Sequence, residues 1–62
     1  MPLIEVSLIE GHTVEEKRRF AEDVTELICK DLKGVTPEMV WVKITDMPAE
    51  NFGVAGTLIA DR

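Results

Sequence analysis

The sequence has few of the residues from which common catalytic and metal-binding sites are built. It contains one histidine, one cysteine and no tyrosine in 62 residues. Because no serine stands beside the histidine, a nucleophilic triad lacks its parts, and a multi-histidine metal site is equally unsupported. Gly53 and Gly56 lack the Lys-Ser/Thr ending and the following helix of a phosphate-binding loop. We therefore expect no metal and no other cofactor.

Basic runs and long apolar runs are also missing. The formal charge is -5, from 7 basic and 12 acidic residues, and no basic run is available to neutralise a row of phosphates, so we expect no nucleic-acid partner. No apolar stretch approaches the roughly 18 residues that cross a bilayer. Residues 1–15 lack the basic segment followed by an apolar one that marks a signal peptide. The sequence predicts a cytoplasmic protein with no membrane partner.

The lone cysteine, Cys29, can form neither an intrachain disulfide nor a metal site by itself. This agrees with a reducing compartment. Since Cys29 falls within a helical pattern beside its apolar stripe, we interpret it as a small packing residue rather than a nucleophile.

The chain length predicts one domain, residues 1–62, with a marginal core. A chain of this size hides only about 60% of its unfolded surface on folding, and a core of that size alone rarely suffices. The composition, 45% apolar and 31% charged, is globular rather than disordered. We expect contacts between subunits to supply the missing stabilisation, and therefore an oligomer.

Hydrophobic periodicity predicts a β-α-β unit, an α+β fold class. Residues 3–9 and 40–45 alternate as strands. Between them, Thr13 and Glu16 fit a capping box that opens a helix over 14–33 with an apolar stripe on one side. Gly34 supplies the left-handed stop after that helix. Such a unit has parallel strands and a right-handed crossover.

The helix can cover only one face of the sheet. That face is predicted to carry Ile4, Val6, Leu8, Val40, Val42 and Ile44. Trp41 and Lys43 point the other way, where Lys43 is expected to pair with Glu5 across the strands rather than to act as an electrophile. The segment NFGVAGTLI, residues 51–59, predicts a small hairpin or arm that could lie on a neighbouring subunit.

Pro2 is the remaining candidate for chemistry. It is either an ordinary strand-edge proline or, once Met1 is removed, a secondary amine at the N-terminus. Methionine aminopeptidases act when the second residue is small, proline included. A model α-amino group titrates near about 7.7 to 8.0, and an apolar pocket or a nearby cation favours the neutral, basic form of such an amine. Whether Pro2 is a general base therefore depends on its surroundings.

Several segments in order resemble the 4-oxalocrotonate tautomerase (2-hydroxymuconate tautomerase) family of the tautomerase superfamily. They are the start Met1-Pro2, LIEG at 8–11, TVEEK at 13–17, ITDM at 44–47 and NFGVAG at 51–56. The resemblance implies a β-α-β subunit with a small C-terminal hairpin that pairs into a four-stranded sheet and assembles as a hexamer, a trimer of dimers. It also implies a small-molecule substrate, an enol or dienol oxo acid.

The same resemblance assigns roles to two residues. Pro2 matches the proline that carries a proton between carbons of the substrate. Phe52 matches an aromatic that lines the pocket and helps to keep the pKa of the amine low. Packing in the core or at an interface is the other interpretation of Phe52, and the two roles are compatible.

At two further positions the chain departs from the family pattern. His12 and Trp41 stand where the family has arginines that hold the substrate's carboxylates and polarise its keto oxygen. An arginine fork binds a carboxylate through two hydrogen bonds, which neither imidazole nor indole can do. We interpret His12 as a substrate contact or a solvated loop residue, and Trp41 as a pocket wall facing an apolar substrate or as subunit packing.

Three hypotheses of function follow. The first is a tautomerase that uses Pro2 as base and then as acid on an acid held differently from the family's usual dicarboxylate. The second is a hydratase, dehalogenase or decarboxylase of the same superfamily, which needs a water-activating carboxylate. The third is a non-enzymatic oligomeric homologue that lost both arginines because it binds no substrate.

Overall fold

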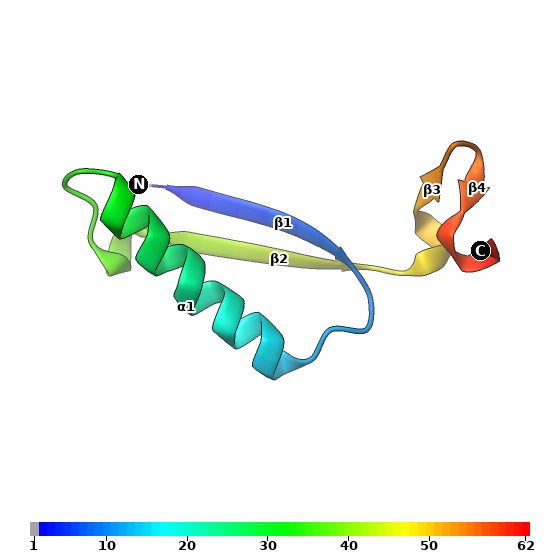
Figure 1. Ribbon diagram of the computed structural model, residues 1–62, viewed down its shortest axis with the longest axis horizontal. Helices are drawn as coiled ribbons and strands as arrows, with labels where there is room; N and C mark the ends of the chain where they lie inside the picture. The colour runs from blue at the N-terminus through cyan, green and yellow to red at the C-terminus, as the bar shows by residue number, and fades with distance from the viewer. Residues whose placement is uncertain (1) are drawn as a thin grey trace.

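The computed structural model describes residues 2–62, and Met1, on whose removal a free amine at Pro2 depends, lies outside the described residues. The chain forms a β-α-β body, residues 2–47, and a projecting arm, residues 48–62 (Figure 1). The body consists of β1 (Leu3–Ile9), α1 (Val14–Asp31), a short 3-10 turn (Pro37–Met39) and β2 (Trp41–Met47). The arm consists of β3 (Gly53–Val54) and β4 (Thr57–Leu58) between two 3-10 turns, Ala49–Asn51 and Ile59–Asp61. The predicted fold class is confirmed.

The strands β1 and β2 are parallel, as predicted. Their register runs from Leu3 opposite Trp41 to Ile9 opposite Met47. The ladder continues to Pro2, because the N–H of Trp41 donates to the carbonyl oxygen of Pro2 at 2.9 Å. Glu5 lies opposite Lys43, but the expected ion pair is not among those of residues 2–62. Register brings the two backbones together without fixing two long, exposed side chains.

The helix begins where predicted and ends earlier. Thr13 caps α1 with both halves of the capping box in place. The last helical residue is Asp31 rather than residue 33, because Leu32 is already extended at φ -107° and ψ 116°. Gly34 follows with φ 84°, a left-handed conformation that glycine adopts without strain. The chain therefore leaves the helix before the glycine and uses it to turn back toward β2.

The second strand is shifted relative to the prediction of 40–45. Val40 belongs to the connector, where its N–H donates to the carbonyl oxygen of Pro37 at 3.1 Å. The strand then continues to Met47, because β1 offers a pairing partner over its full length.

The helix covers the predicted face of the sheet but does not seal it. The inward residues of both strands are half-buried, whereas Leu3 and Trp41 on the open face are 55% and 57% exposed. No residue among 2–62 is fully buried. The subunit therefore has an apolar layer between helix and sheet, but no closed core.

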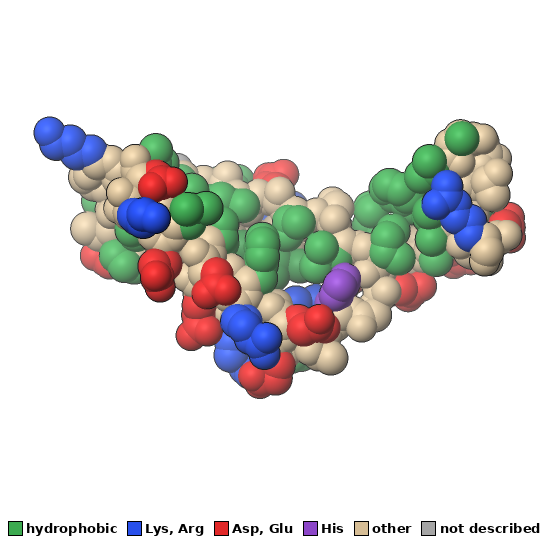
Figure 2. Space-filling view, viewed as in Figure 1, with side chains coloured by type: hydrophobic (Ala, Val, Ile, Leu, Met, Phe, Trp, Pro, Cys, Tyr) green, Lys and Arg blue, Asp and Glu red, His purple; other side chains and the backbone are tan. Residues whose placement is uncertain are grey.

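The shape of the subunit explains this exposure. It measures 45 × 24 × 14 Å, with a radius of gyration of 14.8 Å, against about 11 Å for a compact chain of this length. Its accessible surface is 4860 Å², where about 4,000 Å² is usual for this mass. Figure 2 shows hydrophobic side chains along the body and on the side of the arm that faces the body. Within residues 2–62, no helix is both long and apolar enough to cross a membrane.

The arm is the predicted hairpin. Gly53 pairs with Leu58 and Val54 with Thr57 in antiparallel register. The turn between them has positive φ at both central residues, 54° at Ala55 and 83° at Gly56, which is the backbone of a type I′ turn.

Candidate functional site

Pro2 and Trp41 lie together at one end of the sheet. The hydrogen bond from the Trp41 N–H to the Pro2 carbonyl fixes the two backbones side by side, and Leu3 pairs directly with Trp41. Pro2 is half-buried while the two large side chains beside it are exposed. This end of the subunit therefore presents an open apolar surface around Pro2.

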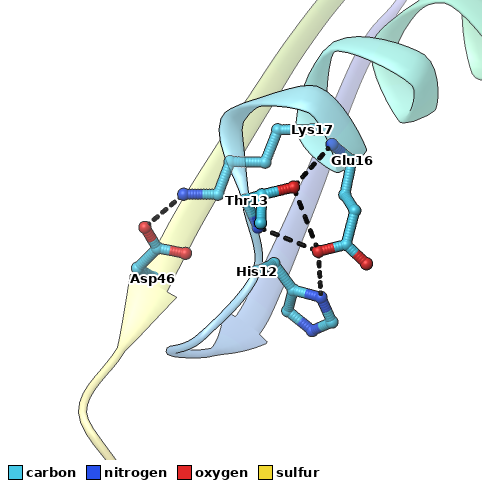
Figure 3. A network of polar contacts seen from close by, with 5 residues as sticks. All are labelled: His12, Thr13, Glu16, Lys17 and Asp46. Carbon is cyan, nitrogen blue, oxygen red and sulfur yellow. Dashed lines mark hydrogen bonds and ion pairs between the residues drawn. The ribbon is translucent and has the colours of Figure 1, made fainter.

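His12 lies at the other end of β1, in the loop that leads into the helix. Gly11, with φ 118°, lets the chain turn away from the strand just before it. The imidazole Nδ1 of His12 is 3.7 Å from Oε1 of Glu16 (Figure 3). This is an ion-pair distance rather than a hydrogen bond. About half of each side chain is exposed, 47% and 54% respectively.

Glu16 is held in place by hydrogen bonds with Thr13. Its Oε1 accepts hydrogen bonds from the Thr13 N–H at 2.9 Å and the Thr13 hydroxyl at 3.3 Å, and its N–H donates to Oγ1 of Thr13 at 3.1 Å. The hydrogen bond from the Thr13 backbone, with a smaller contribution from the charge of His12, lowers the pKa of Glu16. The stabilisation from this carboxylate is therefore present above its ordinary pKa and is lost as pH falls through the lowered one.

The other charged groups at this end of the sheet have partners of their own. Nζ of Lys17, on α1, lies 2.5 Å from Oδ2 of Asp46, on β2. Glu10 accepts a hydrogen bond from the N–H of Ala49 at 3.1 Å, which ties the end of β1 to the start of the arm. Within residues 2–62, the other ring nitrogen of His12, Nε2, has no hydrogen-bond partner.

A hollow of about 170 Å³ opens beside this network. Leu8, Phe20 and Ile44 form its apolar walls, and His12, Glu16 and Lys17 complete its lining. Alternation along the strands predicts Leu8 and Ile44 on the helix-covered face of the sheet, so part of this lining is predictable from the sequence. The role of Glu16 beside His12 was missed, because the capping box already accounted for that glutamate.

Phe52 lies beyond the end of β2, in the arm. It is 37% exposed, and its carbonyl oxygen accepts a hydrogen bond from the N–H of Ile59 at 2.8 Å. The seven residues of each strand separate this end from Pro2, which is roughly 20 Å at about 3.3 Å per residue. The structure therefore brings Pro2 together with Trp41, but it does not bring His12 or Phe52 to them within one subunit.

The residues present do not suggest a metal centre. Within residues 2–62, no group of three or more histidine, cysteine, aspartate or glutamate side chains could hold a metal ion. Cys29 is half-buried and free.

The family model described as "Tautomerase enzyme" matches residues 2–62. The chain belongs to the tautomerase family. This membership indicates an isomerase. It also agrees with the family resemblance on which Pro2 and Phe52 were singled out.

Individual tautomerases are similar to the chain over nearly its whole length. It is 38% identical over 61 residues to the 2-hydroxymuconate tautomerase of Bacillus subtilis, covering 98% of this chain and 97% of that protein. It is 36% identical over 62 residues to a "Probable tautomerase" of Halalkalibacterium halodurans, covering 100% of both. Among solved structures, one from a study of the 4-oxalocrotonate tautomerase isozymes of Methylibium petroleiphilum has a TM-score of 0.92 at 39% identity, covering 98% of this chain and 94% of that one.

Proposed function

We propose that this protein is a tautomerase that moves a proton within a small enol or dienol oxo acid, with the N-terminal amine of Pro2 as general base and then as general acid. The observation that carries the proposal is the family match over residues 2–62, which includes Pro2, the residue immediately before β1. Positioned acids and bases of this kind contribute about 10²- to 10⁴-fold to a rate.

The surroundings of Pro2 suit a neutral amine. Trp41 and Leu3 supply apolar surface beside it. When another subunit or the substrate covers that surface, water is excluded and the charged ammonium form is disfavoured. Each unit by which the pKa of the amine falls corresponds to about 1.4 kcal/mol of preference for the neutral form.

We propose further that the working enzyme is a homo-oligomer, a hexamer built as a trimer of dimers. Within residues 2–62, neither edge of the two-stranded sheet is covered by another strand, and such a small sheet is marginal alone. Pairing these edges between subunits would give a four-stranded sheet. An active site shared between subunits would combine Pro2 and Trp41 of one subunit with His12 and Phe52 of others. These two pairs lie at opposite ends of a single subunit.

The substrate we propose is an oxo acid with one carboxylate and an apolar or aromatic remainder. Trp41 offers a broad apolar surface near Pro2, and His12 offers a single nitrogen where a fork of donors would be needed to hold a carboxylate bidentately. Phe52 adds a second aromatic surface from the arm.

The test is the rate of ketonisation of enol phenylpyruvate and of a 2-hydroxydienoate by protein whose intact mass shows that Met1 has been removed. Pro2→Ala should lower kcat by about 10²- to 10⁴-fold, because alanine offers a primary amine of different geometry and basicity. Pro37→Ala is the matched control, since Pro37 lies in the connector, and it should keep the wild-type rate.

Both variants must have the circular dichroism spectrum and the assembled mass of the wild type, so that a lower rate cannot come from misfolding or dissociation. Full activity of Pro2→Ala in a correctly assembled protein would disprove the proposal.

A further inference from the structure

A single hydrogen bond links the body of the subunit to its arm. Oε2 of Glu10, the residue directly after β1, accepts from the N–H of Ala49 in the first turn of the arm at 3.1 Å. Among the hydrogen bonds and ion pairs of residues 2–62, this is the one that joins residues 2–47 to residues 48–62. The direction in which the arm projects therefore depends on this contact and on the backbone beside it.

Glu10 holds the chain on both sides of Pro48. Its N–H donates to the carbonyl oxygen of Met47 at 2.9 Å, and its carboxylate accepts from Ala49. Because peptide units are planar, the soft torsions between these two anchor points are φ and ψ of Pro48. The proline ring fixes φ, which is -61°. The rotation that remains is ψ of Pro48, and the two contacts of Glu10 hold it at 143°.

The arm is internally connected from Pro48 to Phe52. The N–H of Asn51 donates to the carbonyl oxygen of Pro48 at 2.9 Å, and the N–H of Ile59 donates to that of Phe52 at 2.8 Å. Figure 2 shows that the hydrophobic side chains of the arm lie on the side that faces the body. A change in ψ of Pro48 would therefore move Phe52 together with the rest of the arm.

We propose that Glu10 is a positioning residue for Phe52, which sets where this aromatic side chain meets the apolar or aromatic remainder of the substrate. The inference rests on the proposed function, in which Phe52 forms one surface of the site. Glu10 itself touches no substrate in this role. It determines how tightly the remainder is held, because it determines the direction of the arm.

Contacts with a neighbouring subunit are the other way to hold the arm, so the experiment uses the assembled protein. The probe is 3-phenylpropanoate, a carboxylate with an aromatic end and no keto group to react. Isothermal titration calorimetry measures its Kd. Amide hydrogen exchange at Ala49, followed by NMR, reports the contact itself. In the wild type this amide should exchange slowly, and free exchange would overturn the inference.

Three variants at Glu10 separate the contact from the charge. Glu10→Ala removes the acceptor, so the Ala49 amide should exchange faster and Kd should rise about three- to tenfold. Glu10→Asp keeps the charge but shortens the side chain by a methylene group, and it should change both quantities in the same direction. Glu10→Gln removes the charge but keeps the reach and an acceptor oxygen. It should keep slow exchange and a Kd within about twofold of the wild type.

A double-mutant cycle tests whether Glu10 acts through Phe52. Phe52→Ala should weaken binding of the probe about tenfold, because it removes the aromatic surface. Adding Glu10→Ala to that variant should cause no further loss, since the side chain that Glu10 positions is already absent. Losses that add independently would overturn the inference. So would wild-type affinity in Phe52→Ala, or in a Glu10→Ala variant whose Ala49 amide exchanges freely.

Two further comparisons keep the result interpretable. If Glu10→Ala did not assemble, rescue by Glu10→Gln and its absence in Glu10→Asp would still decide, and the reverse order would overturn the inference. Pro2→Ala should bind the probe as the wild type does, because binding does not use the proton transfer at the amine. A failure of the catalytic role of Pro2 is thus distinguishable from a failure of the positioning role of Glu10.

Discussion

The body and the arm are held together in different ways. In the body, two strands pair over seven residues each, and an 18-residue helix opens with a complete capping box. In the arm, two strands of two residues each are joined by a turn whose central residues both have positive φ. Long runs of backbone hydrogen bonds therefore support the body. An isolated hairpin as short as the arm is marginal in water.

Neither the body nor the arm completes a hydrophobic core by itself. The body leaves Trp41 and Leu3 exposed on its open face, and the arm exposes Phe52, Val54 and Leu58. Both sets are surfaces that a second copy of the chain can cover. The proposed site follows the same division, with Pro2 at one end of the body and Phe52 in the arm.

The largest expected effect comes from breaking the apolar surface of the arm. Leu58 is 41% exposed in the subunit, and Leu58→Asp would place an unpaired charge there, which is costly once the surface is covered. We expect loss of at least about 2 kcal/mol per interface, as at other interface hot spots, with dissociation into smaller species and loss of the tautomerase rate. Sedimentation and enzyme assays at one protein concentration measure both.

Ala55→Asp is the matched control for that variant. It adds the same charge to the same arm, at the turn, where aspartate tolerates positive φ. The assembled mass should stay that of the wild type. An intact, active oligomer of Leu58→Asp would show that the arm does not mediate assembly.

A moderate effect is expected from breaking the cap of the body. Thr13→Ala removes the hydroxyl that bonds the N–H of Glu16, and loss of such a cap costs about 1 kcal/mol. Thr36→Ala is the control, because Thr36 stands at the start of the connector without a side-chain cap hydrogen bond, and it should change stability by less than about 0.5 kcal/mol. Urea unfolding at fixed concentration measures both, and equal losses would contradict the role given to the cap.

The smallest effect sharpens the comparison by strengthening the arm. Ala55 adopts φ 54°, which strains a residue with a Cβ and suits asparagine before glycine in a type I′ turn. Ala55→Asn should raise stability by about 0.5 kcal/mol. Ala60→Asn has the same side-chain change at a position without positive φ and should give no gain. The measurement is thermal unfolding of the two variants side by side. Equal unfolding midpoints would contradict the strain assigned to Ala55.

Much of the local structure could be predicted, because its causes are local. The alternation of residues 3–9, the capping pair Thr13 and Glu16, and the glycines of the hairpin each determine nearby backbone geometry, and all three predictions are confirmed. The end of the helix was wrong by two residues, because the return of the chain to β2 decides where Leu32 becomes extended. The ion pair between Glu5 and Lys43 was wrong, because matching register leaves exposed side chains free.

For the candidate site, the sequence determined which groups are available: one proline behind Met1, one histidine, one tryptophan, and a phenylalanine beside a glycine hairpin. Their chemistry follows from residue type alone. Only the tertiary structure decided where they lie, because the parallel pairing of β1 and β2 sets Pro2 and Trp41 at one end of the sheet and His12 and Phe52 beyond the other. The capping box brings Glu16 within 3.7 Å of the imidazole, because its carboxylate folds back onto Thr13, the residue that follows His12.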